Sequence, residues 1–151
     1  MDQNMKQLIK GLNEDLANEY SSVIMYTHFA ATVSGIDYKV LKPFFESEIP
    51  DEQGHALYLA DKIATLGGEP TTEPAPIEKA QDVESMLKVV HQAESDTIKR
   101  YEKRREQAES LGLTELVVKL EDMIADETKH KEETERILKN PSHESFTAPR
   151  S

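Results

Sequence analysis

The sequence contains no cysteine, and this absence removes several kinds of site. Without thiols the chain has no disulfide framework, no Cys-ligated zinc site and no iron–sulfur cluster. Basic residues are in the minority, with 18 Lys and Arg against 29 Asp and Glu, which gives a formal net charge of −11. Binding to a phosphate backbone needs clustered Lys and Arg, so we expect no nucleic-acid partner. The negative charge suits a protein that attracts cations, although acidity is also the ordinary route to solubility.

Long apolar runs are missing as well. No run approaches the ~20 residues that a membrane-spanning helix needs, so we expect no contact with a membrane. The N-terminal stretch MDQNMKQLIKGLNEDL is amphipathic and lacks the apolar core and cleavage site of a secretory signal. We therefore expect a cytoplasmic protein. A chain of 151 residues is long enough for one domain with a sizeable core.

Four long segments place apolar residues every three or four positions, which is the spacing of an amphipathic helix. They extend over about residues 5–35, 38–66, 82–110 and 114–139. Asp82 is a suitable N-cap for the third helix. No segment has the alternating pattern of a strand, so the predicted fold class is all-α.

Two prolines fall within the second of these helices. Pro43 lies in its first turns, where proline is tolerated. Pro50 lies further in and removes the hydrogen bond to the carbonyl of Glu46, so we expect a kink or a local irregularity there. A break of the helix at Pro50 is the alternative.

The second and third helices are separated by residues 67–81, GGEPTTEPAPIEKAQ, which are rich in Pro, Gly and Thr and have no periodicity. This segment is too long for a tight helical hairpin and is typical of the long crossover in some four-helix bundles. A linker between two domains is the alternative, but each half would then be a two-helix hairpin unable to bury its apolar face. We predict a four-helix bundle over residues 1–140, with a long crossover between helices 2 and 3, followed by a short polar tail over 141–151.

One pattern of acidic, tyrosine and histidine residues occurs twice, with an offset of 75 residues (94 − 19 and 130 − 55, for example). The corresponding pairs are Glu19 and Glu94, Tyr26 and Tyr101, Asp51 and Asp126, Glu52 and Glu127, and His55 and His130. Glu and His at positions i and i+3 share one face of a helix. A lone Glu on each of two helices, with Glu-x-x-His on each of the other two, is the ligand set of di-iron and di-manganese carboxylate sites in four-helix bundles.

The charge of this set supports a site for two metals. A buried carboxylate must be paired, protonated or bound to metal. Four Glu and two neutral His leave about four negative charges, which two divalent cations neutralise. Mixed carboxylate and imidazole ligands suit iron or manganese better than calcium. Solvated helix faces that match by coincidence, or a salt-bridged polar core, are the alternatives.

The spacing also suggests a role for each residue. We predict Glu52 and Glu127 as bridges between two metals, Glu19 and Glu94 as terminal ligands, and one imidazole for each metal from His55 and His130. Asp51 and Asp126 lie four residues before these histidines, so they could accept an imidazole N–H across the bundle.

Other polar residues carry weaker signals. Tyr26 and Tyr101 each follow a lone Glu by seven residues, and they either hydrogen-bond a ligand carboxylate or pack in the core. His91 is expected to be a packed or interface histidine rather than a further ligand, and His28 and His143 are expected at the surface.

The arrangement of Glu19, D-E-Q-G-H at 51–55, Glu94 and D-E-T-K-H at 126–130 resembles the bacterioferritin branch of the ferritin-like superfamily. The resemblance covers about residues 5–140, including the length of the crossover. It implies a ferroxidase centre with two iron ions in each subunit, where Fe²⁺ is oxidised by O₂ or H₂O₂ and the ferric product is stored in a hollow homo-oligomer. Carried over by position, the catalytic residues are Glu19, Glu52, His55, Glu94, Glu127, His130 and Tyr26, of which all but Tyr26 bind metal.

Two departures from this family limit the resemblance. Bacterioferritins bind haem through a Met directly after the second-helix glutamate; that position is Gln53 here, so we expect no haem. The family's short fifth helix has no counterpart in the pattern of residues 141–151, so a 24-subunit cage, a 12-subunit shell, a smaller ring and a dimer all stay open. Resemblance to the Dps-type mini-ferritins is weaker, because their iron site lies between subunits. The alternative functions are a rubrerythrin-like di-iron enzyme that scavenges peroxide without storing mineral, and a Dps-like protective shell.

Overall fold

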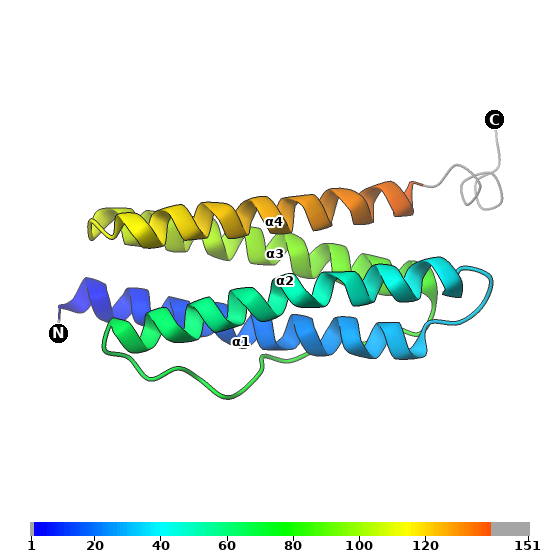
Figure 1. Ribbon diagram of the computed structural model, residues 1–151, viewed down its shortest axis with the longest axis horizontal. Coiled ribbons are helices and arrows are strands. Elements are labelled where there is room, and N and C mark those ends of the chain that lie inside the picture. The colour runs from blue at the N-terminus through cyan, green and yellow to red at the C-terminus, as the bar shows by residue number, and fades with distance from the viewer. Residues whose placement is uncertain (1, 140–151) are drawn as a thin grey trace.

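The computed structural model describes residues 2–139, which form four long helices and no strand. The helices are α1 (Gln3–Thr32), α2 (Tyr38–Thr65), α3 (Val83–Ser110) and α4 (Thr114–Leu138). Figure 1 shows two antiparallel hairpins, α1 with α2 and α3 with α4, packed against each other. The crossover runs the length of the bundle, so α3 begins at the same end as α2 and runs parallel to it. The prediction of an all-α four-helix bundle with a long crossover between helices 2 and 3 is confirmed.

The helix ends follow the local signals in the sequence. The side chain of Asp82 caps α3, because its Oδ1 accepts a hydrogen bond from the backbone N–H of Ser85 at 2.9 Å. Between α3 and α4, Gly112 adopts a φ of 70°, a conformation that glycine reaches without a steric penalty. The short turn that results reverses the chain and brings α4 back along α3.

α2 continues through both of its prolines. One helix extends from Tyr38 to Thr65 with Pro43 and Pro50 inside it, so the alternative of a helix break at Pro50 is wrong. The continuity has a packing reason, since Glu48 and Glu52 on either side of Pro50 are both buried in the bundle. Both therefore stay in one helical register on the inward face.

The core is divided into two apolar layers with a polar layer between them. One layer contains Leu8, Leu12 and Leu16 of α1 with Leu59 and Ile63 of α2, and helices α3 and α4 complete it. The other layer surrounds Phe29 and Phe45 and includes Val90 of α3. Along every helix the residues of these two layers flank a buried polar stretch. The apolar layers therefore close the middle of the bundle from both ends.

The crossover is fastened to the outside of α1. The backbone N–H of Ala75 donates to the carbonyl of Ala17 at 3.0 Å, and the hydroxyl of Ser21 donates to the carbonyl of Ala75 at 2.5 Å. Nearer its start, the backbone N–H of Thr71 donates to Oδ1 of Asn13 at 2.8 Å. These contacts tie the segment to the bundle along its length.

Two predictions concern the end of the chain. The polar tail over 141–151 and the missing fifth helix fall on residues outside the described range, so both stay predictions, as does the domain boundary at residue 140. Over residues 2–139, no helix is both long and apolar enough to cross a membrane.

Candidate metal centre

All four helices contribute to the polar layer in the middle of the bundle. Glu19 comes from α1, Glu94 from α3, and a Glu-x-x-His pair comes from each of α2 and α4. All six predicted ligands are at most 5% exposed: Glu19, Glu52, His55, Glu94, Glu127 and His130. Helical spacing explains their common direction, because a Glu and a His three residues apart lie on the same face.

Four of the six ligands form a compact group. Glu19, Glu52, His55 and Glu127 each offer a ligand atom within 4.8 Å of the others. Nδ1 of His55 lies 3.6 Å from Oε2 of Glu19, 3.9 Å from Oε1 of Glu52 and 3.5 Å from Oε1 of Glu127. These separations leave room for one cation among the four atoms.

His130 lies near the same two carboxylates as His55. Its Nδ1 lies 3.7 Å from Oε1 of Glu52 and 3.8 Å from Oε1 of Glu127. One oxygen from each of these two carboxylates therefore lies close to both histidines. This position agrees with the bridging role predicted for Glu52 and Glu127. Glu94 on α3 feels the charges of Glu127 and His130, but Glu94 and His130 are not part of the compact group of four.

The hydrogen bonding of the six residues tests whether metals fit. Eight buried side-chain nitrogen and oxygen atoms of the described residues lack a hydrogen-bond partner, and six of them are one atom from each predicted ligand. They are Oε2 of Glu19, Oε1 of Glu52, Oε1 of Glu94, Oε1 of Glu127 and Nδ1 of both histidines. Buried polar atoms without partners are rare in folded proteins, and an ion is one recognised reason for them. The donor set therefore fits the binding of divalent cations.

The electrostatics of the carboxylates lead to the same conclusion. Burial, together with the charges of Glu19 and Glu127, raises the pKa of Glu52 well above its usual range. Burial also raises the pKa of Glu127 to about 7 and that of Glu94 to about 8. Without cations the centre therefore holds protons near neutral pH, and binding of cations displaces them.

The outer nitrogens of the two histidines are held by carboxylates from across the bundle. Nε2 of His55 lies 2.9 Å from Oδ2 of Asp126, and Nε2 of His130 lies 3.0 Å from Oδ2 of Asp51. Because a carboxylate accepts, Nε2–H donates, and Nδ1 faces the centre, where loss of its proton frees a lone pair for a metal. The predicted cross-bundle contacts are thus present. Burial lowers the pKa of both histidines, but contacts with Glu19 and Glu48 respectively outweigh it and raise each pKa to about 9.

The two tyrosines hydrogen-bond ligand carboxylates and are also core residues. The hydroxyl of Tyr26 on α1 donates to Oε2 of Glu94 on α3 at 2.7 Å. The hydroxyl of Tyr101 on α3 donates to Oε1 of Glu19 on α1. Each tyrosine therefore hydrogen-bonds the lone Glu of the other helix. Burial raises the pKa of both phenols, which keeps them protonated as donors.

Sequence reasoning missed three buried charged residues next to the centre. Oε2 of Glu48 lies 2.6 Å from Nε2 of His130. Asp15 and Arg104 form a buried ion pair between α1 and α3, with Nε of Arg104 2.7 Å from Oδ2 of Asp15. Glu48 and Asp15 each precede a predicted ligand Glu by four residues, and this spacing alone indicates that they share its buried helix face. Neither is repeated 75 residues later, so the repeat did not identify them.

The remaining histidines lie away from the centre. His91 is half-buried, and its Nε2 contacts Oε2 of Glu135 at 2.8 Å, in agreement with a packed residue. His28 is exposed, as expected, and His143 lies outside the described residues.

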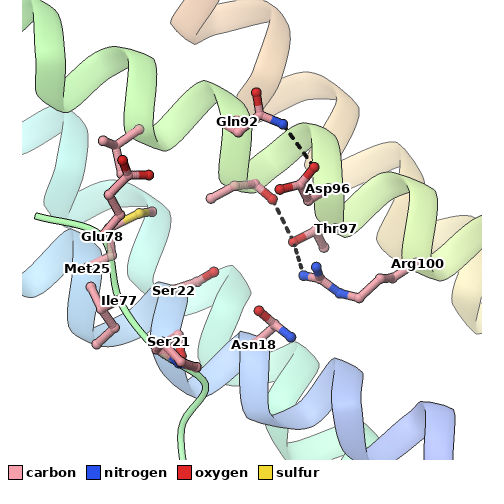
Figure 2. A pocket seen from close by; sticks show the side chains of 13 residues that line it. Asn18, Ser21, Ser22, Met25, Ile77, Glu78, Gln92, Asp96, Thr97 and Arg100 are labelled. Atoms are coloured by element: carbon pink, nitrogen blue, oxygen red, sulfur yellow. Dashed lines mark hydrogen bonds between the residues drawn. The ribbon is translucent and has the colours of Figure 1, made fainter.

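A cavity of about 170 Å³ lies between α1, α3 and the crossover. Figure 2 shows Ser22 and Arg100 beside it, with Arg100 hydrogen-bonded to Thr97. None of the six predicted ligands lines this cavity. The metal centre and the cavity are therefore separate features of the bundle.

The fold and the site together define a four-helix bundle with a buried carboxylate and histidine centre. The chain belongs to the ferritin-like family, because the family model described as "Ferritin-like domain" matches residues 9–142. Comparison with curated proteins finds no significant match.

Solved structures agree with this family. One of ferritin-like, diiron-carboxylate proteins from Bacillus anthracis str. Ames is 68% identical, with a TM-score of 0.90, and the match covers 91% of this chain and 99% of that one. An archaeal Dps homologue from Halobacterium salinarum is 23% identical, with a TM-score of 0.85 over 93% of this chain and 84% of that one. A Dps protein from Bacillus brevis is 20% identical, with a TM-score of 0.86 over 92% and 99%. The two Dps matches show the fold alone, and assignment to the bacterioferritin branch stays a prediction.

Proposed function

We propose that this protein is a ferroxidase that oxidises Fe²⁺ to Fe³⁺ at a centre within one subunit and stores the product in a homo-oligomer. The observation that carries the proposal is the set of six unpartnered ligand atoms, which four helices of a single chain bring together. The diiron-carboxylate description of the Bacillus anthracis relative supports iron as the metal.

Each of the six residues has a distinct role in holding iron. Glu52 and Glu127 would bridge two Fe²⁺, because one oxygen of each lies near both Nδ1 atoms. Glu19 with His55 completes one position, and Glu94 with His130 completes the other. Four carboxylates neutralise two divalent cations, and they favour Fe³⁺ further because their charge and hard oxygen ligands interact more strongly with a trivalent ion. Each Fe²⁺ gives up one electron, and the two electrons, with two protons from the solvent, reduce one O₂ to H₂O₂ or one H₂O₂ to two waters.

The surrounding residues hold the carboxylates and imidazoles in position. The hydroxyls of Tyr26 and Tyr101 fix one oxygen of each terminal carboxylate and leave the other free for metal. Asp51 and Asp126 fix the orientation of the two imidazole rings. The apolar layers on both sides exclude bulk water, which strengthens each of these interactions.

We expect no haem in this protein. Gln53 follows Glu52 on the exposed face of α2, and its amide is not the thioether ligand that haem iron would need there. A haem absorption band in protein purified from haem-supplemented cells would contradict this expectation.

The proposal is tested by adding Fe²⁺ to the metal-free protein in air and measuring ferric absorbance, iron content and native mass. We expect fast oxidation and many irons per subunit in a large assembly. Glu52→Ala should abolish the fast phase, whereas Glu46→Ala, an exposed change on the same helix, should not. Normal oxidation by Glu52→Ala would overturn the assignment.

The same measurements separate the alternative functions. Two irons per subunit with rapid turnover of H₂O₂ would indicate a peroxide-scavenging enzyme. Iron oxidation by an assembly that also retards DNA at physiological salt would indicate a Dps-like shell, which the net charge of −11 makes unfavourable.

A further inference from the structure

Glu48 is a buried carboxylate that the proposed chemistry does not use. It lies on α2 one turn before Glu52 and is 3% exposed. Its Oε2 is 2.6 Å from Nε2 of His130, an ion-pair contact that lacks the angles of a hydrogen bond, and it has no hydrogen-bond partner. The same Nε2 also has Oδ2 of Asp51 at 3.0 Å. His130 thus faces two carboxylates with its outer nitrogen.

The other histidine has different surroundings. Among the described residues, Asp126 is the one carboxylate that lies within 4.0 Å of Nε2 of His55, and its side chain is 47% exposed. The repeat places Met123 on α4 where Glu48 stands on α2 (48 + 75 = 123). Met123 is 3% exposed and belongs to an apolar layer. The buried carboxylate of Glu48 therefore lies beside His130, whereas the equivalent position of the sequence repeat holds the thioether of Met123.

This difference acts on a metal through the imidazole and through space. A negative charge beside the outer N–H makes the inner nitrogen a stronger donor, and removal of a carboxylate that holds a ligand histidine typically lowers metal affinity about 10–100-fold. The buried charge of Glu48 also attracts a cation directly, with less screening than the half-exposed Asp51 and Asp126.

We propose that Glu48 makes the two metal positions unequal, so that the position at His130 and Glu94 binds a divalent cation more tightly and fills first. The position at His55 and Glu19 fills second and exchanges faster with free Fe²⁺. The inference rests on the proposed function only in requiring that the six residues bind metal.

Titration of the full-length metal-free protein with Co²⁺ tests this, because cobalt reports each bound ion by visible absorbance and binding heat without turnover. We expect two steps whose dissociation constants differ by about tenfold or more. His130→Ala should remove the tight step, and His55→Ala the weak one. The reverse assignment, or two equal sites in the wild-type protein, would overturn the proposal.

The internal repeat supplies the matched variants. Glu48→Met gives α2 the residue that α4 has, and it should weaken the tight step about tenfold, so that the two steps merge. Glu48→Gln keeps the size of the side chain and should act in the same direction, so it decides the question if Glu48→Met does not fold. Met123→Glu should tighten the weak step. Two unchanged steps in folded Glu48→Gln would overturn this inference and leave the proposed function standing, whereas no Co²⁺ binding by the wild-type protein would overturn both.

Discussion

The helix pair α1–α2 and the helix pair α3–α4 each supply half of the metal centre, and a distance of 75 positions relates their residues. The predicted ligands, the tyrosines and the outer aspartates correspond one to one between the halves. The charged residues nearby have no charged counterpart 75 positions away. The counterpart of Asp15 is Val90, that of Arg104 is Phe29, and that of Glu48 is Met123. The groups that would contact metal are thus repeated in both halves, whereas the buried charged residues next to them are not. Two equal ligand sets can therefore differ in affinity and in how the bundle stabilises them.

The largest expected effect tests the symmetric part of this comparison. Glu52→Ala and Glu127→Ala remove equivalent bridges, so each should abolish fast Fe²⁺ oxidation, beyond the about 10–100-fold loss that removal of an outer partner gives. The residual rates of the two variants should agree within a few-fold. Stopped-flow absorbance after mixing with Fe²⁺ in air measures both. Fast oxidation retained by one of them would show that the halves do not contribute equally.

The second prediction concerns the ion pair that only one half of the repeat supports. Asp15 and Arg104 are 1% and 3% exposed, and two guanidinium nitrogens contact the carboxylate. Burial raises the pKa of Asp15 although Arg104 and Arg100 lower it, so desolvation offsets much of the attraction. Asp15→Ala leaves Arg104 buried without its carboxylate and should lower the free energy of unfolding by about 3–5 kcal/mol, measured by urea denaturation of the metal-free protein.

The other half again provides the control. Combining Asp15→Val with Arg104→Phe installs the residues that stand at Val90 and Phe29, and removes both charges together. The double variant should be more stable than Asp15→Ala alone, because a well-packed apolar pair can replace a buried ion pair at little cost. Gly11 is part of this arrangement, since a Cβ there would lie 2.2 Å from Nη1 of Arg104. Equal destabilisation by the single and double variants would argue against desolvation as the dominant effect.

The same asymmetry explains which parts of the centre could be predicted from the sequence. The helices follow from apolar spacing, and the burial of the six predicted ligands in one polar layer follows from the duplicated pattern, in which both halves place Glu and His on the inward face. Glu48, Asp15 and Arg104 have apolar counterparts, so the repeat carried no signal for them. The spacing of seven residues puts Tyr26 and Tyr101 on the inward faces, but each one hydrogen-bonds the Glu of the other helix, and that depends on how α1 and α3 pack side by side. That packing is set by contacts between segments far apart in the chain.

The third prediction uses the pH dependence of the metal-free protein. Folding raises the pKa of Glu94 to about 8 and of Glu127 to about 7, and that of both histidines to about 9. The folded state therefore binds more protons than the unfolded state between the ordinary and the raised pKa values, so stability falls as pH rises through this range. The melting temperature should be lower at about pH 8.5 than at about pH 5.5, by at least about 5 °C.

Bound metal should reverse this trend. Cations replace the protons, and their affinity rises as the carboxylates ionise, so protein loaded with Co²⁺ should melt higher at about pH 8 than at about pH 6. Differential scanning calorimetry with and without metal measures both slopes. A metal-free protein that gains stability between these pH values would contradict the raised pKa values.

The smallest expected effect separates the two outer aspartates. Asp126→Asn leaves Nε2 of His55 without a carboxylate, whereas Asp51→Asn leaves His130 with Glu48 at 2.6 Å. We therefore expect Asp126→Asn to weaken Co²⁺ binding at the His55 position about tenfold, and Asp51→Asn to weaken binding at the His130 position no more than about threefold. Both side chains are about half exposed, so solvent screening limits either effect. Calorimetric titration resolves the two steps, and an equal loss in both variants would mean that Glu48 does not support His130.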